Sequence, residues 1–76
     1  MSIEEQVRKI VADNLSHPVE SVQLDSDLVT DLKADSIDSV ELVMAVEDEF
    51  SITIPEDDMR NLKTVGDIVK YVNEKQ

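Results

Sequence analysis

Residues that interrupt helices are scarce in this chain. Among its 76 residues there is one glycine, Gly66, and there are two prolines, Pro18 and Pro55. Glycine and proline are the strongest breaks in a helical pattern, so their scarcity favours a fold made of helices. The length is sufficient for one domain, spanning residues 1–76. We therefore predict a single domain of the all-α class.

Two longer helices are indicated in the first two thirds of the chain. Apolar residues recur there at three- and four-residue spacing, which is typical of an amphipathic helix. Ser2 and Glu5 can form a capping box for a first helix, which must end before Pro18. Asp35 is a natural N-cap for a second helix over residues 36–50.

The last third of the chain predicts a short helix followed by a longer one. The short helix covers about residues 55–61 and has Pro55 as its first helical residue. Thr64 and Asp67 form a further capping pair, and the helix behind them runs to about Glu74. Together these patterns predict a small four-helix bundle with three longer helices and one short one.

The segment between the first two helices, residues 17–34, has no sustained apolar period. Unstructured connections of this length are uncommon in compact domains unless they serve a function. We expect a long loop that is held to the core by isolated apolar side chains. These are Val19, Val22, Leu24, Leu28, Val29 and Leu32.

Acidic residues outnumber basic ones by 18 to 7, which gives a net charge of −11. Such a chain repels phosphate backbones and anionic lipids, so we expect no nucleic-acid or membrane partner. The longest apolar run, Leu42 to Val46, is too short to cross a bilayer, and residues 1–16 lack the apolar core of a targeting peptide. We expect a monomeric cytoplasmic protein with basic protein partners. A processed organellar form is the alternative.

The predicted second helix carries two apolar faces. The first should face the core and consists of Leu42, Val43, Val46 and Phe50. The second, which is bordered by acids, consists of Ile37, Val40 and Met44. Residues 34–59 contain nine acids and no Lys or Arg. The second face is therefore either a docking surface for a basic, partly apolar partner or a second buried face with solvated acids beside it.

Ser36 falls at the first position of this helix, where free backbone N–H groups favour a phosphate. A serine at a helix start is usually structural. The alternative is that another enzyme modifies Ser36. A serine hydrolase is the weakest interpretation, because no base or oxyanion site accompanies this serine. The only histidine, His17, is expected to be a solvent-facing residue at the helix end. The chain has no cysteine, which excludes a cysteine nucleophile, disulfides and thiolate metal sites.

The segment LKADSIDSVELVMAVE, residues 32–47, resembles the acyl carrier proteins of type II fatty-acid synthesis. The resemblance extends over nearly the whole chain. Its further parts are Ile3-Glu4-Glu5, Glu49-Phe50, Ile54-Pro55, Thr64-Val65-Gly66-Asp67 and Tyr71-Val72. Two residues depart from the family: Lys33 stands where glycine is frequent, and Ile37 where leucine is commoner.

The resemblance implies a carrier and not an enzyme. A phosphopantetheinyl transferase would move 4′-phosphopantetheine from coenzyme A to Ser36, in preference to Ser26 or Ser39, and acyl groups would be held as thioesters on the thiol of this cofactor. Fatty-acid synthesis enzymes would dock through basic patches onto the second helix. The expected docking residues are Asp35, Ile37, Asp38, Glu41, Met44, Glu47 and Asp48.

The resemblance also implies a cleft between the helices in which the acyl chain lies. Its expected walls are Leu28, Val29, Val46, Ile54, Met59 and Leu62. Specialised carriers of polyketide, peptidyl or D-alanyl groups share the Asp-Ser pair, so they are the nearest alternative. An acidic interaction module that is never modified is the alternative from a different class.

No catalytic metal site is expected, because no segment has the glycine and spacing of an EF-hand loop. Crowded carboxylates repel one another, however, and divalent cations relieve that repulsion. We therefore expect weak cation sites at two places. These are Asp31 with Asp35 and Asp38, and, separately, Glu47 with Asp48.

Overall fold

The computed structural model describes residues 2–76, so that Met1 of the expected domain lies outside the described residues. Within them the chain forms helices and no strand, which confirms the all-α bundle. The α-helices are α1 (Ile3–Leu15), α2 (Ser36–Phe50), α3 (Glu56–Met59) and α4 (Val65–Lys75). A single turn of 3-10 helix, η1 (Val19–Ser21), lies in the loop between α1 and α2.

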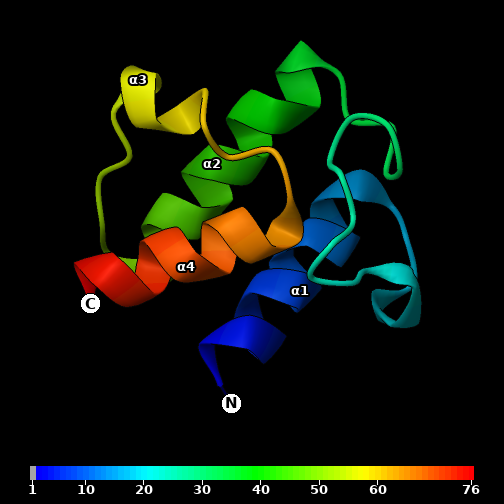
Figure 1. The fold of residues 1–76 in the computed structure, drawn as a ribbon, viewed down its shortest axis with the longest axis horizontal. Coiled ribbons are helices and arrows are strands. Elements are labelled where there is room, and N and C mark those ends of the chain that lie inside the picture. Colours follow the sequence, from blue (N-terminus) through cyan, green and yellow to red (C-terminus); the bar gives the residue numbers. More distant parts are fainter. Residues whose placement is uncertain (1) are drawn as a thin grey trace.

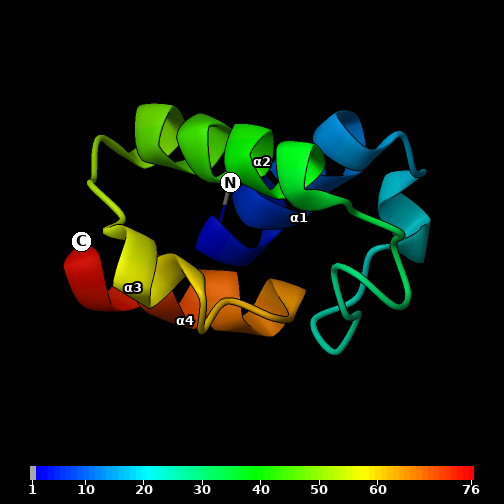
Figure 2. The ribbon, with the colours of Figure 1, turned by 90° about the horizontal axis from the view of Figure 1, so that it is seen from above.

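The three longer helices surround one core. Helix α1 packs against both α2 and α4, and α2 and α4 lie on opposite sides of the molecule in Figure 2. The short helix α3 lies beside one end of this arrangement, and the loop between α1 and α2 lies at the other end (Figure 1). The loop and α3 therefore close the two ends of the space between the longer helices.

Capping boxes begin all three longer helices; the sequence predicts two of these boxes and the N-cap residue Asp35 of the third. They are formed by Ser2 with Glu5, Asp35 with Asp38 and Thr64 with Asp67. In each box the N-cap side chain accepts a hydrogen bond from the backbone N–H of the acidic residue, whose carboxylate accepts one in return. The starts of the helices are thus determined by residues three apart in the sequence.

Helices α1 and α2 end as predicted, before Pro18 and at Phe50, whereas α3 differs from the prediction. Helix α1 stops at Leu15 because Ser16 adopts a left-handed conformation with φ of 58°. Ser51 ends α2 in the same way with φ of 54°. Helix α3 is shorter than predicted, and Pro55 is its N-cap and not its first helical residue, because its ψ of 153° is extended.

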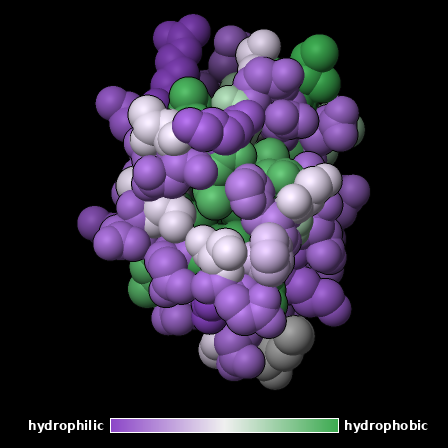
Figure 3. Space-filling model, turned by 90° about the vertical axis from the view of Figure 1, so that its right-hand side faces the viewer, coloured by the Kyte–Doolittle hydropathy of each residue, from purple (hydrophilic) through white to green (hydrophobic). Residues whose placement is uncertain are grey.

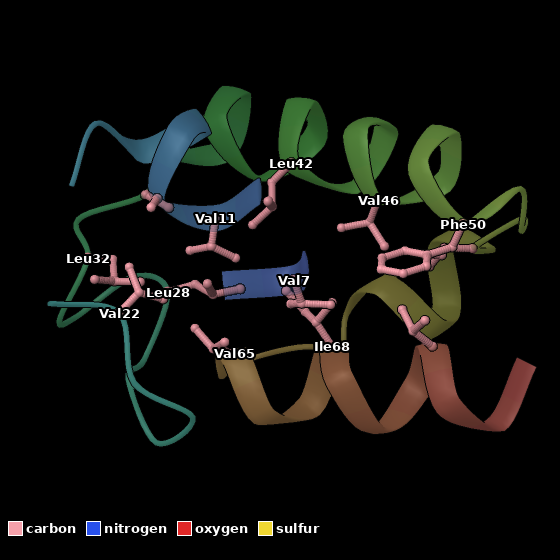
Figure 4. Packing of buried hydrophobic residues seen from close by; sticks show 14 residues of the cluster. Val7, Val11, Val22, Leu28, Leu32, Leu42, Val46, Phe50, Val65 and Ile68 are labelled. Carbon is pink, nitrogen blue, oxygen red and sulfur yellow. The ribbon is translucent and has the colours of Figure 1, made fainter. Parts of the chain in front are cut away.

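The core is almost entirely aliphatic, and Phe50 is its single aromatic residue. Figure 4 shows side chains of α2 and α4 pointing toward each other, with those of α1 between them. Leu42 and Val46 of α2 are each only 1% exposed. The predicted core face of α2 is therefore confirmed for these two residues and for Phe50, while Val43 is half-buried at its edge.

The loop between α1 and α2 is attached to the core by fewer side chains than expected. Val22, Leu28 and Leu32 are buried, as predicted. The other three expected anchors are exposed and the prediction is wrong for them: Val19, Leu24 and Val29. Backbone contacts hold these parts of the loop instead, and the face in Figure 3 that contains the loop is largely hydrophilic, with apolar side chains showing at its centre.

Main-chain and side-chain hydrogen bonds replace the missing apolar anchors. The Arg8 guanidinium of α1 donates to the carbonyls of Val22 at 2.7 Å and Val19 at 3.1 Å. The N–H of Leu28 donates to the carbonyl of Lys63 at 2.9 Å, which joins the loop to the connection before α4. Periodicity cannot reveal such anchors, because any residue can supply a backbone group.

Gly66 makes a further contact with the loop possible. Its N–H donates to the carbonyl of Leu24 at 2.7 Å. A Cβ at this position would lie only 2.9 Å from the same oxygen, closer than ordinary van der Waals contact. The single glycine of the chain is thus required where α4 begins against the loop, and not at a turn.

Lys33 occupies a backbone conformation that favours glycine. Its φ of 64° is in the left-handed region, where a side chain costs about 1–2 kcal/mol. The loop imposes this conformation, because the N–H of Lys33 donates to Val29 and that of Ala34 donates to Leu28. Lysine thus adopts here a conformation that glycine, the residue frequent at this position in the family, takes up without strain.

We predict that Lys33→Gly stabilises the protein by about 1 kcal/mol, because glycine removes the strain of the left-handed conformation at some cost in chain entropy. Urea unfolding of the two proteins measures the difference. Lys33→Ala is the matched control: it removes the same charge but keeps the strain, so its stability should stay near that of the original chain. Equal stabilisation by both variants would contradict the conformational explanation.

Candidate functional site

Ser36 is the first residue of α2 and its side chain is exposed. The capping box brackets it on both sides. The N–H of Asp38 donates to the Asp35 carboxylate at 2.8 Å, and the N–H of Asp35 donates to the Asp38 carboxylate at 3.3 Å. Both carboxylates are thereby directed at backbone groups, and the Ser36 hydroxyl is left open to solvent.

The end of the loop before Ser36 is attached to the core by two buried residues, Leu32 and Ala34. The Leu32 carbonyl lies 3.0 Å from Nε2 of His17. Because a carbonyl only accepts, this ring nitrogen donates the proton. The expectation of a solvent-facing His17 is wrong: the ring is half-buried and holds the loop before Ser36. The only histidine of the chain therefore binds the loop at Leu32, and no hydrogen bond joins it to Ser36.

The start of α2 fits a phosphate ester on Ser36. The first N–H groups of a helix have no partner within the helix. Asp35 satisfies the N–H groups of Asp38 and Ser39 through its side chain and its carbonyl. The N–H groups of Ser36 and Ile37 remain for a ligand, and the helix dipole favours an anion at this end.

Ser26 and Ser39 also follow an aspartate in the sequence, but the structure places them differently from Ser36. Ser26 is buried in the loop, and its hydroxyl accepts a hydrogen bond from the N–H of Gln23 at 3.0 Å. Ser39 is half-buried and lines a cavity. Ser36 alone of the three combines an exposed hydroxyl with a helix start.

A cavity of about 100 Å³ lies beside α2, in the space that α3 closes. Five of the six expected wall residues line it: Leu28, Val46, Ile54, Met59 and Leu62. Val29 does not, because the turn formed around Asp27 leaves its side chain 60% exposed. Further wall residues, which sequence reasoning missed, are Ser39, Leu42, Val43 and Ile68. Their only signal was the apolar stripe on α2 and α4, which does not separate a cavity from ordinary core.

Side chains of α2 and α4 hold the segment around α3 against the cavity. The Glu47 carboxylate accepts a hydrogen bond from the N–H of Ile54 at 2.7 Å. The Tyr71 hydroxyl donates to the Asp58 carboxylate at 2.7 Å. Glu47 is half-buried in this role, which differs from that of an exposed docking residue.

The second apolar face of α2 is at the surface. Ile37, Val40 and Met44 are 67%, 47% and 57% exposed, and we call them the exposed strip. Of the acids expected beside them, Asp38 and Glu47 are half-buried, while the others are exposed: Asp35, Glu41 and Asp48. The alternative that both faces of α2 are buried is therefore wrong.

The structure does not assemble the three-carboxylate cation site expected at Asp31, Asp35 and Asp38. No three or more His, Cys, Asp or Glu side chains of residues 2–76 are grouped so as to hold a metal ion. Asp31 accepts a hydrogen bond from the N–H of Asp27, and Asp35 and Asp38 bond to each other's backbone. Each of these carboxylates already accepts a hydrogen bond from a backbone N–H group. We therefore expect any effect of divalent cations on stability to come from general screening of charge.

Residues 5–72 match the protein family described as "Phosphopantetheine attachment site". This match and the exposed serine at the start of α2 define the class of the protein. It is a carrier domain that holds 4′-phosphopantetheine covalently, as the resemblance implied. No helix among residues 2–76 has the length and apolar character needed to span a membrane.

Comparison with curated relatives narrows the class. The chain is 46% identical over 76 residues to "Acyl carrier protein" of Chlamydia trachomatis serovar D, covering 100% of this chain and 99% of the relative. It is 46% identical over 74 residues to "Acyl carrier protein" of Rickettsia massiliae, covering 97% and 86%. The chain belongs to the acyl carrier protein family, whose members serve fatty-acid synthesis as carriers and not as catalysts. The predicted family and function are confirmed.

Tyr71 predicts a dependence of stability on pH. Burial and the hydrogen bond to Asp58 raise its pKa from 10.0 to about 12, and Glu47 adds to the effect. The folded state therefore holds this proton more tightly than the unfolded state. The stabilisation is complete below about pH 10 and is lost as the pH rises toward about 12.

Urea midpoints at about pH 9 and about pH 11 measure this loss. Tyr71→Phe has no phenolic proton to lose and is the matched control. Any loss of stability that it shows must come from other groups, such as the lysines, including Lys75 over the ring of residue 71. We expect the original chain to lose more stability than Tyr71→Phe between the two pH values. Equal losses would show that Tyr71 is not the titrating group.

Proposed function

We propose that Ser36 is the residue that carries 4′-phosphopantetheine, and that a phosphopantetheinyl transferase attaches it from coenzyme A. The observation that carries this proposal is the exposed Ser36 hydroxyl at the first position of α2, beside unoccupied helix N–H groups. When bound, the cofactor supplies a thiol on which acyl groups are held as thioesters. The chain itself contains no cysteine that could do so.

Each residue around Ser36 has a separate part in this role. The N–H groups of Ser36 and Ile37 stabilise the negative charge of the phosphodiester. Asp35 and Asp38 fix the start of the helix, and their charge is partly offset by the N–H groups they bind. No side chain of residues 2–76 forms a hydrogen bond with the Ser36 hydroxyl that would activate it, and His17 is bonded to Leu32. We therefore propose that the base comes from the transferase.

We predict that apo protein incubated with coenzyme A and a broad-specificity phosphopantetheinyl transferase gains the mass of one phosphopantetheine. Intact mass spectrometry measures the gain. Ser36→Ala should show none, because the accepting oxygen is absent. Ser39→Ala, one helical turn away, is the matched control and should be modified like the original chain.

Modification of Ser36→Ala would move the attachment to another serine. No modification of any of the three proteins, with an active transferase and folded substrates, would reject the carrier site. It would favour an acidic interaction module instead.

The cavity beside α2 is proposed to shelter the hydrocarbon part of the acyl group. Its apolar walls favour methylene groups over water. Its volume of about 100 Å³ is below the roughly 150 Å³ of an apolar cavity that accepts benzene. A long acyl chain therefore requires the walls to separate. The α3 side is the candidate to move, since Glu47 and the Tyr71–Asp58 pair hold it through single hydrogen bonds.

We further propose that partner enzymes dock on the exposed strip and the acids beside it, with basic patches of their own. An exposed apolar patch with carboxylates at its rim suits a partner that combines apolar and cationic side chains. Glu41 and Asp48 are exposed and have no structural hydrogen bond among residues 2–76. Glu47 is tied to Ile54, so a change there would also alter the cavity wall.

We predict that Glu41→Lys lowers kcat/KM of the transferase for the apo protein by roughly three- to tenfold at low salt, because a rim charge changes the association rate. The defect should shrink as salt is added. Glu4→Lys, at an exposed position on α1, is the matched control and makes the same change in net charge. If both variants lose the same activity, net charge and not the surface of α2 governs docking.

A further inference from the structure

A second depression of about 370 Å³, which we call the basic groove, adjoins the apolar cavity. The two share Leu28, Ser39 and Leu62. The remaining residues of the groove come from the loop and from the connection between α3 and α4. They are Asp27, Val29, Thr30, Arg60 and Lys63. An apolar space and a charged one thus lie side by side, with Ser39 of α2 at their junction.

The groove concentrates positive charge in a strongly acidic molecule. Arg60 and Lys63 are two of only seven basic residues in the chain. Its one acid, Asp27, directs its carboxylate at the N–H groups of Thr30 and Val29, both at 2.9 Å. These bonds hold the pKa of the Asp27 carboxyl below its ordinary value. The carboxylate therefore has its hydrogen-bond partners in the backbone of its own turn, and Lys63 attracts it only through space.

Both cations are available to a ligand. Arg60 lies 3.7 Å from Glu56 and 3.9 Å from Asp57, but all three side chains are exposed, and such pairs contribute little. No carboxylate of residues 2–76 lies within the 4.0 Å of an ion pair with Lys63. An anion in the groove would thus compete with weak partners only.

The groove is fixed in position close to Ser36. Ser39 is three residues further along α2, which corresponds to a rise of about 4.5 Å and a position on the same side of the helix. The opposite walls are joined by the bond from the N–H of Leu28 to the carbonyl of Lys63 at 2.9 Å. Ser36 therefore lies one helical turn from Ser39, the residue of α2 that lines both the apolar cavity and the basic groove.

We propose that the basic groove receives the free carboxylate of a short acyl group that ends in a carboxylate, whereas acyl groups that end in a methyl enter the apolar cavity. The proposal rests on Ser36 as the attachment site. A carboxylate in the cavity would lose its hydration without gaining a partner. At the groove the same carboxylate meets a guanidinium and an ammonium group, which bind carboxylates by charge-assisted hydrogen bonds.

The test uses holo protein loaded with one of two acyl groups of equal length. Succinyl ends in a carboxylate and butyryl ends in a methyl. The carboxyl carbon of succinyl is labelled with carbon-13, and its pKa is read from the NMR shift as the pH is varied. The variant is Arg60→Gln with Lys63→Gln. The matched control removes two cations outside the groove, by Lys9→Gln with Lys70→Gln.

We expect the pKa of the succinyl carboxylate to be higher by about 0.5 in the groove variant than in the original chain, in line with partly exposed ion pairs. The control should raise it by clearly less. The amide signals of Thr30 and Lys63 should also differ between the succinyl and butyryl forms of the original chain. In the groove variant that difference should be reduced.

Equal rises in the groove variant and the control would overturn the proposal, because the general field of the protein would then explain them. An unchanged pKa in the groove variant would overturn it as well. Loading at Ser36 is checked first by intact mass. Failure to load counts against Ser36 itself, whereas successful loading with no effect of Arg60 and Lys63 counts against the groove alone.

Discussion

The orientation of α2 about its own axis determines which of its residues face the core, the cavity and the solvent. Burial of Leu42, Val46 and Phe50 against the rest of the core fixes that orientation. Once it is fixed, the exposed strip of Ile37, Val40 and Met44 faces solvent, and Ser39 faces the cavity. Ser36 follows at the first turn of the same rigid element. A single apolar stripe thus orients the proposed attachment serine, the exposed strip and the cavity wall relative to one another.

The acidic surface opposes folding through repulsion between its carboxylates, and hydrogen bonds at the helix starts offset part of this cost. Like charges repel, yet the carboxylates of the capping boxes accept hydrogen bonds from backbone N–H groups at the positive ends of the helix dipoles. Hydrogen bonds from Ser2 to Glu5 and from the backbone of Lys63 to Asp67 lower the pKa of both carboxyls. Acidic residues at helix starts therefore contribute to stability in a molecule whose net charge opposes compactness.

Most of the fold, and the place of the proposed attachment serine at the start of a helix, could be predicted from local patterns. Helix starts depend on residues three apart, and the core face of α2 depends on its period. The errors concern contacts between distant segments. Val29 was expected in the cavity wall but faces solvent, and His17 was expected in solvent but binds Leu32. None of these contacts has a signature within one helical turn.

The sequence by itself determined the all-α class, the three capped helices, the family and the position of Ser36, because each depends on neighbouring residues or on a contiguous motif. Only the tertiary structure decided the rest. The requirement for Gly66 and the basic groove with Arg60 arise where the loop meets the start of α4 and the segment before it. Such features depend on the distance between segments far apart in the chain, and only packing fixes that distance.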